Sequence, residues 1–159
     1  MIYGMIDERN EKSYTDMNKL FGVLRDAPKR YNWLITDCAC NVCNDIWDRQ
    51  DEQGYCWMSG EELTDYMKTH DIQWLFAVFS GFEKDISLED ILKYPLPYAD
   101  ENPDFWQNPI KMQHPLATVE IVPWDACLTL FFSKDKELTE AFRNGYPQSE
   151  DLYLYNEKP

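Results

Sequence analysis

The sequence predicts an α+β fold: a single domain with a mixed or mainly antiparallel sheet, three to four helices and a C-terminal unit of a hairpin and a helix. Apolar runs typical of strands alternate with segments of helical periodicity, and two of the runs are close enough to form a hairpin. The chain, residues 1–159, is 44% hydrophobic, which is enough apolar material to form one core. We therefore expect one domain that folds without a stabilising metal or disulfide.

The first third of the chain is typical of a strand, a helix and a second strand. Residues 1–6 form a short apolar run, and Ser13 with Asp16 three residues later predicts the start of a helix. That helix should end at Pro28, and residues 31–36, apolar on both faces, should form an interior strand. Helical spacing places four apolar side chains on one face: Met17, Leu20, Phe21 and Leu24.

The middle of the chain predicts a strand, a helix and the central strand of the sheet. Residues 54–58 are a candidate strand, and Ser59 with Glu62 forms a second capping box. The helix that begins there should end near His70. Residues 72–82 are the most apolar run in the chain and are too few to span a membrane, so we expect a central strand.

A long Pro-rich loop at about 94–115 follows a short helix that is expected over residues 87–93, with Ser87 as its cap. The loop holds five of the nine prolines. A loop of this length in a compact domain is more often functional or mobile than a simple connection.

The C-terminal unit should begin with strands at 118–122 and 126–132, joined as a hairpin. A last helix is expected over residues 134–143, with Gly145 as its stop signal. The alternating run LYLY at 152–155 predicts a closing edge strand.

The chain is strongly acidic, with a formal net charge of −14 that arises mainly between residues 31 and 110. Such a surface repels nucleic acid and anionic lipid, since both bind proteins through Lys and Arg. We therefore expect no nucleic acid or membrane partner, and a basic protein is the natural complement. Charge alone does not predict the oligomeric state.

A cytoplasmic location is expected from the absence of targeting signals. The first ten residues lack the basic region and the apolar core of a signal peptide, and no apolar run reaches 18 residues. The five cysteines, an odd number, favour thiols in a reducing compartment over a disulfide framework.

Four of the five cysteines lie in the acidic stretch DCACNVCNDIWDRQDEQGYC, residues 37–56. Their spacing, C-x-C-x2-C-x12-C, would permit a four-thiolate zinc site, but the usual paired C-x2-C elements are missing. Small buried thiols are the preferred interpretation, and no metal or other cofactor is expected. The alternative zinc ligands would be Cys38, Cys40, Cys43 and Cys56.

No catalytic residue is assigned, because no catalytic signature stands out. A cysteine nucleophile would need a histidine base, and the chain offers only His70, at a predicted helix end, and His114, in the Pro-rich loop. The acidic groups lack the ligand order of a calcium loop, and the glycines form no nucleotide-binding motif. A small hydrolase-type enzyme with Cys/His chemistry remains an alternative.

Aromatic side chains occur among the acidic ones in two segments, and protein interfaces often combine Trp or Tyr anchors with a charged rim. The alternative is that Phe105 and Trp106 fold back and hold the loop against the core. The residues expected to bind a partner are Asp45, Trp47, Asp48, Asp51, Glu52, Asp100, Glu101, Asp104 and Trp106.

The segments YNWLI, SGEELTDYM, IVPWDACLTLFFSKDKEL and DLYLYN resemble small uncharacterised bacterial proteins of the type that serves as immunity proteins of polymorphic toxins. The resemblance covers most of the chain as an order of elements and implies an α+β protein that neutralises a toxin by binding it. We therefore expect a non-enzymatic, acidic protein-binding module that inhibits a basic toxin or nuclease. A soluble accessory protein without catalytic role is the other alternative.

Overall fold

The computed structural model describes residues 1–8, 15–41 and 44–159. The strands are β1 (Tyr3–Asp7), β2 (Tyr31–Cys40), β3 (Cys56–Ser59), β4 (Trp74–Glu83), β5 (Val119–Trp124), β6 (Leu128–Ser133) and β7 (Glu150–Asp151). The helices are α1 (Met17–Val23), α2 (Asp45–Gln53), α3 (Gly60–Thr69), α4 (Leu88–Ile91), α5 (Lys136–Gly145) and α6 (Leu152–Asn156), with 3-10 turns η1 (Ala27–Arg30) and η2 (Pro103–Trp106).

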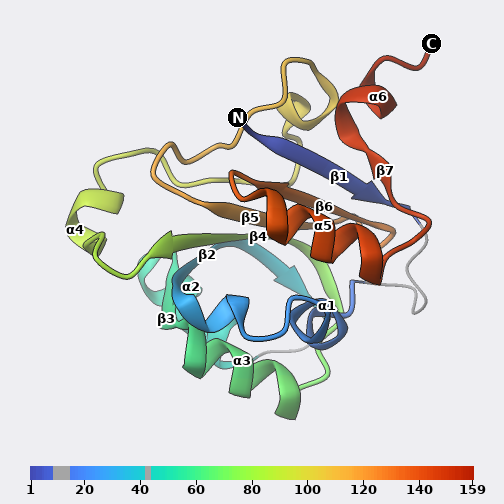
Figure 1. Ribbon diagram of the computed structural model, residues 1–159. Helices are drawn as coiled ribbons and strands as arrows, with labels where there is room; N and C mark the ends of the chain where they lie inside the picture. Colours follow the sequence, from blue (N-terminus) through green and yellow to red (C-terminus); the bar gives the residue numbers. More distant parts are fainter. Residues whose placement is uncertain (9–14, 42–43) are drawn as a thin grey trace.

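The fold is α+β, as predicted, and is built on one seven-stranded sheet with the order β3-β2-β4-β5-β6-β1-β7 (Figure 1). Every strand pair in it is antiparallel. Strands β2 and β4 are interior, as expected, and each is almost continuously buried because both faces of the sheet are covered.

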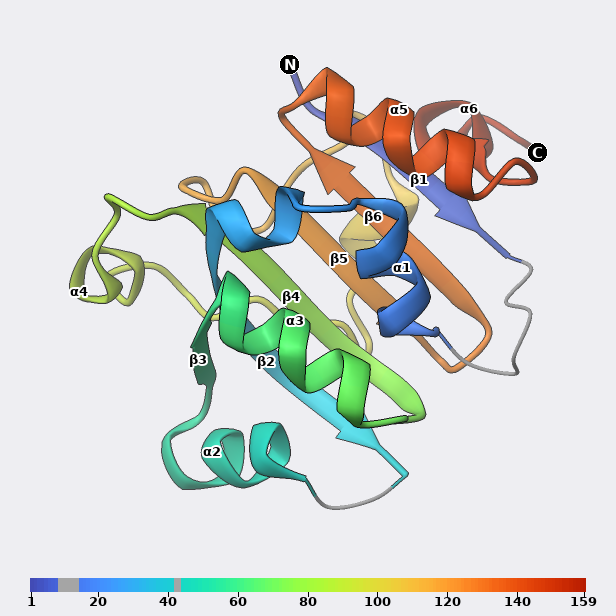
Figure 2. The same cartoon turned by 60° about the horizontal axis from the view of Figure 1, so that its bottom comes forward.

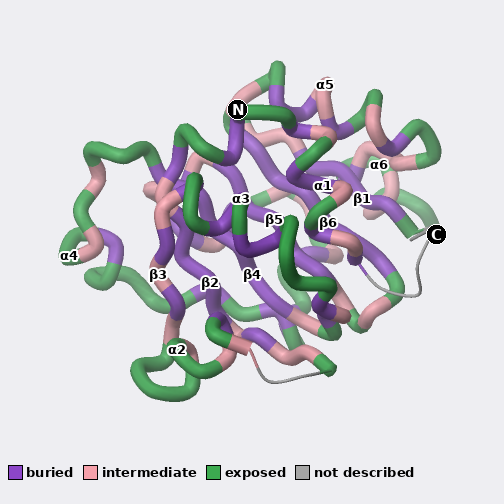
Figure 3. Tube along the Cα trace, turned by 90° about the horizontal axis from the view of Figure 1, so that it is seen from below, coloured by how far each residue is buried: buried purple, intermediate pink, exposed green. Residues whose placement is uncertain are grey.

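The two faces of the sheet are covered by different kinds of structure. Helices α1, α3 and α5 lie across one face, with α1 between the other two (Figure 2). The opposite face is covered by the Pro-rich segment with η2, and by α6 (Figure 1). Each face has its own apolar core, and the buried strands run through the middle of the molecule (Figure 3).

The predicted helix caps are largely confirmed. The Ser59 hydroxyl accepts from the Glu62 N–H at 3.1 Å, and α3 ends at His70. Ser87 caps α4 in the same way. Helix α1 is capped by Asp16, and its four predicted apolar side chains are buried, whereas Ser13 lies outside the described residues.

The β5–β6 hairpin is confirmed, with its turn at residues 125–127, two positions later than the sequence suggested. Trp124 still belongs to β5, where it pairs with Leu128. Asp125 and Ala126 both adopt positive φ angles, 51° and 55°, and the Cys127 N–H donates to the Trp124 carbonyl at 3.2 Å.

Helix α5 ends at Gly145, as predicted, but this glycine does not adopt the positive φ of a terminal glycine. Its missing Cβ allows Val23 of α1 to pack directly against it.

The prediction of a closing strand at 152–155 is wrong, because these residues form α6. The Asp151 carboxylate accepts from the Leu154 N–H at 3.1 Å and starts the helix, and Leu152 is buried against Gly4 of β1. The edge strand is only the two residues of β7. The described residues contain six helices, and α2 and α6 are the two that the sequence analysis did not predict.

Candidate functional site

Helix α2 presents four of the predicted acidic residues to solvent. It begins at Asn44, whose side chain accepts from the Trp47 N–H at 2.9 Å, and ends at Gly54 with a φ of 89°. Ile46 is buried, and Trp47 is half-buried against the helix-side core. The exposed acidic residues of α2 are Asp45, Asp48, Asp51 and Glu52.

The side chain of Gln50 attaches α2 to the edge of the sheet. Its Nε2 donates to the Cys38 carbonyl at 3.2 Å, and its Oε1 accepts from the Cys38 N–H. Strand β3 pairs with β2 only as far as Ile35, so the Gln50 amide takes the place of a neighbouring strand beyond that point. Helix α2 is therefore fixed to the C-terminal half of β2.

Asp37, the residue next to Cys38, attaches the tip of the Pro-rich loop to the same strand. Its Oδ2 accepts from the Ala99 N–H at 2.7 Å and from the Asp100 N–H at 2.9 Å. Its φ of 50° coincides with an irregularity in the β2–β4 pairing. Two consecutive residues of β2 thus hold the two acidic segments at one edge of the sheet.

We call this surface the acidic edge and define it as Asp45, Asp48, Asp51, Glu52, Asp100 and Glu101. The loop also approaches α2 directly, since Leu96 is the nearest side chain to a Cβ placed on Gly54, at 3.9 Å. Leu96 and Tyr98 are 39% and 47% exposed beside it. The sequence analysis did not assign Leu96 to the site, although the alternation in YPLPY was a usable signal.

Trp106 and Asp104 have a different setting from the acidic edge. The Trp106 ring lies edge-on to Trp124 at 5.3 Å between centroids and near Tyr155 at 6.4 Å. Phe105 is buried, and Asp104 remains exposed. This packing corresponds to the alternative in which Phe105 and Trp106 hold the loop against the core.

Two cysteines of the acidic stretch, Cys38 and Cys40, lie close together beside α2. The Sγ atoms of Cys38 and Cys40 are 3.9 Å apart, and Cys56 lies on the neighbouring strand. Burial raises the pKa of Cys38 and raises that of Cys56 to about 11, despite the opposing effect of Arg49. The Cys38 and Cys56 thiols are therefore protonated at neutral pH, and a metal ion bound there would have to displace their protons.

The zinc alternative also included Cys43, which lies outside the described residues. Within residues 1–8, 15–41 and 44–159, no three His, Cys, Asp or Glu side chains converge in an arrangement that could hold a metal ion.

The two histidines have structural surroundings. His114 is buried, its Nε2 donates to the Ile91 carbonyl at 2.9 Å, and its Nδ1 accepts from the Leu116 N–H at 3.2 Å. Burial lowers its pKa, which favours the neutral ring. His70 is exposed and stacks on Tyr66 with 3.9 Å between ring centroids. In the described part of the chain, neither ring has a hydrogen bond to a cysteine.

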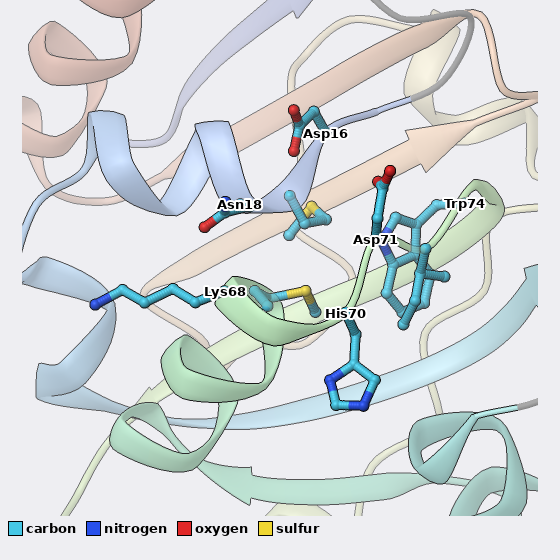
Figure 4. A pocket seen from close by; sticks show the side chains of 9 residues that line it. Asp16, Asn18, Lys68, His70, Asp71 and Trp74 are labelled. Carbon is cyan, nitrogen blue, oxygen red and sulfur yellow. The ribbon is translucent and has the colours of Figure 1, made fainter.

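A small cleft opens where the N-terminus of α1 faces the end of α3 and the start of β4 (Figure 4). Its volume is about 200 Å³, below the usual range for a small-molecule site. Polar groups line its rim and apolar ones its floor: Asp16, Asn18, Lys68, His70 and Asp71, then Met17, Met67, Ile72 and Trp74.

A buried carboxyl group, Glu120 of β5, lies beneath the Pro-rich loop and was not singled out from the sequence. It accepts from the Gln113 N–H at 3.0 Å and from Gln113 Nε2 at 3.1 Å. Gln113 in turn exchanges two hydrogen bonds with the Tyr98 backbone, so it connects Glu120 to the tip of the Pro-rich loop. Burial raises the pKa of Glu120 to about 7, although the Gln113 hydrogen bonds act to lower it.

Comparison with protein-family models, with curated proteins and with solved structures finds no match to this chain. The described helices include none with the length and apolar character needed to cross a membrane. The candidate site is thus defined by the arrangement of its own residues.

Proposed function

We propose that this protein is a non-enzymatic binding module that uses the acidic edge to recognise a basic site on a protein partner. The observation that carries the proposal is the ion pairing. No described Lys or Arg pairs with any of the six carboxylates of the acidic edge, whereas acidic residues elsewhere are in part paired, as Glu61, Glu62 and Glu150 are. The edge therefore presents six uncompensated negative charges.

Uncompensated charge of this kind favours association with a cation-rich surface. Exposed charges act over a Debye length of about 10 Å at 0.1 M salt, so a group of six raises the encounter rate with a basic partner. The gain lies mainly in the association rate and in the rejection of acidic partners. An interaction of this type weakens as salt is added.

Apolar contact would come from Leu96 and Tyr98, which lie beside the acidic edge. Exposed Tyr rings are frequent anchors in protein interfaces, where surrounding charged groups form a rim. Trp47 and Trp106 are half-buried against the core, so they contribute less surface than the sequence suggested. The proposed interface thus combines two exposed apolar side chains with six carboxylates.

Inhibition of a basic toxin or nuclease is the biological form of this proposal, in line with the resemblance to immunity proteins. The negative groups would occupy a site that otherwise holds phosphate. A cytoplasmic location belongs to the same proposal, together with the exclusion of nucleic acid and membranes as partners.

The test is capture of partners on the immobilised protein, with a charge-reversed variant as comparison. The variant D48K/D51K/E52K reverses three of the six charges of the acidic edge, and E83K/E89K/E137K makes the same change of net charge at other exposed positions. We expect a basic protein to bind the wild type and the control, to elute with salt, and to be lost from the first variant. Equal retention by both variants would exclude the acidic edge as the binding surface.

A further inference from the structure

A second hollow, of about 230 Å³, is lined by residues of α1, of α3 and of the segment that follows α1. Figure 2 shows α1 and α3 side by side on the helix-covered face of the sheet. The lining of the hollow includes three cations, Arg25, Lys29 and Lys68, and one carboxylate, Asp26. The molecule as a whole carries a charge of −14, so this is a local reversal of sign. The hollow itself carries about two net positive charges.

The cations of this hollow are poorly neutralised. Lys29 approaches Asp26 only to 4.0 Å, at the limit of an ion pair, and the Asp26 side chain is almost fully exposed. Arg25 and Lys68 have no ion pair within the described ranges. Two cations are therefore available to an anion that enters the hollow.

The local conformation departs from what stability alone would select, at two positions that line the hollow. Arg25 has a φ of 58°, in the left-handed region where glycine is favoured at a helix end. Gly22 lies inside α1, where alanine is favoured, and a Cβ there would meet nothing within 4 Å. Departures of this kind without a packing reason are characteristic of functional sites.

The direction of the Lys68 side chain also supports the interpretation of the hollow as a functional site. In Figure 4 its side chain runs along α1, away from His70 and Asp71, and Asn18 of α1 lies near it. Lys68 and Asn18 line both the small cleft and the basic hollow. The ammonium group is thus directed along the α1–α3 groove.

We propose that the basic hollow binds a small phosphate monoester. Such a ligand carries between one and two negative charges at neutral pH, which matches the net charge of the hollow. The guanidinium of Arg25 suits two phosphate oxygens, and Lys68 supplies a second point charge. This site is separate from the acidic edge and takes a ligand of opposite charge.

The test is a titration of the folded protein with inorganic phosphate, followed by ¹H–¹⁵N NMR at constant ionic strength. We expect saturable shifts of the Gly22, Arg25 and Lys68 amide signals, and glycerol 3-phosphate should bind at least as tightly. In R25G, which removes the charge and suits the positive φ, the Kd for phosphate should rise about tenfold or more, as expected for one charge-assisted contact. K68M should have the same effect, whereas K111M removes an exposed lysine elsewhere and should have none.

Three results would overturn the proposal. Phosphate that shifts the signals no more than chloride would exclude the site. An unchanged Kd in folded K68M or R25G would exclude the location, and acetate that binds as tightly as phosphate would exclude the ligand class. None of these results depends on a partner at the acidic edge, so the two proposals fail separately.

Discussion

The stability of this protein should depend on the buried carboxyl group of Glu120. Its side chain is fully enclosed between the sheet and the Pro-rich loop, and its hydrogen-bond partner is the neutral Gln113. Ser80, opposite Glu120 on β4, is also neutral, and its hydroxyl has no hydrogen-bond partner among the described residues. Without a nearby cation, the ionised form of Glu120 is the costly one.

The size of the contribution of Glu120 to the free energy of unfolding follows from its pKa. A rise from the ordinary value of 4.5 to about 7 corresponds to about 3 kcal/mol, at 1.36 kcal/mol for each pH unit. The protonated form is favoured in the folded state, so this contribution is fully present below pH 4.5. It is lost as the pH rises from 4.5 to about 7, because the unfolded chain releases the proton first. Above that range the free energy of unfolding no longer changes through this group.

The variant E120Q isolates this contribution, since an amide stays neutral throughout. The amide that E120Q introduces can accept only one of the two Gln113 hydrogen bonds, so the variant carries a constant cost at every pH. From pH 5 to pH 8, urea denaturation should show the free energy of unfolding of E120Q rising by about 2–3 kcal/mol relative to that of the wild type. E137Q, a change at an exposed position, serves as the control and should show no such divergence. A constant difference between the wild type and E120Q from pH 5 to pH 8 would refute the reasoning.

Two further predictions concern the loop and α2. W106A should lower the free energy of unfolding by about 2–3 kcal/mol, because the ring packs on Trp124 and Tyr155, whereas the more exposed Tyr98 should tolerate alanine at a much smaller cost. Thermal denaturation of both variants checks this, and equal losses would contradict it. Q50A removes both hydrogen bonds to Cys38 and should cost about 1–3 kcal/mol, with faster amide exchange in α2 as the specific readout. A loss of stability in Q50A without faster exchange in α2 would contradict the role of Gln50 in attaching the helix.

The tertiary structure alone decided which polar groups are buried and which acidic segments lie side by side. Glu120 belongs to a strand that sequence reasoning identified, but its enclosure depends on the Pro-rich loop that crosses over it. Trp106 could have faced a partner or the core, and the choice rests on contacts with Trp124 and Tyr155, which are distant in sequence. The acidic edge depends on Asp37 and Gln50, whose partners are backbone groups of other elements.

The run at 152–155 and helix α2 show where local patterns become ambiguous. LYLY alternates as a strand does, but the Asp151 cap and a packing site for Leu152 on β1 favour a helix instead. The stretch before Gly54 contains two helix signals, an Asn cap and a terminal glycine, but its closely spaced cysteines also fit a metal-binding loop.

By itself the sequence determined the fold class, the strands that form the interior of the sheet, the hairpin and the caps at Ser59 and Ser87. These features depend on periodicity and on hydrogen bonds between residues a few positions apart, so a short stretch of sequence is enough to predict them. Strand order, the burial of Glu120 and the joining of the two acidic segments required the tertiary structure. Their energies come from contacts between residues far apart in the chain, and no local pattern encodes which of those contacts will form.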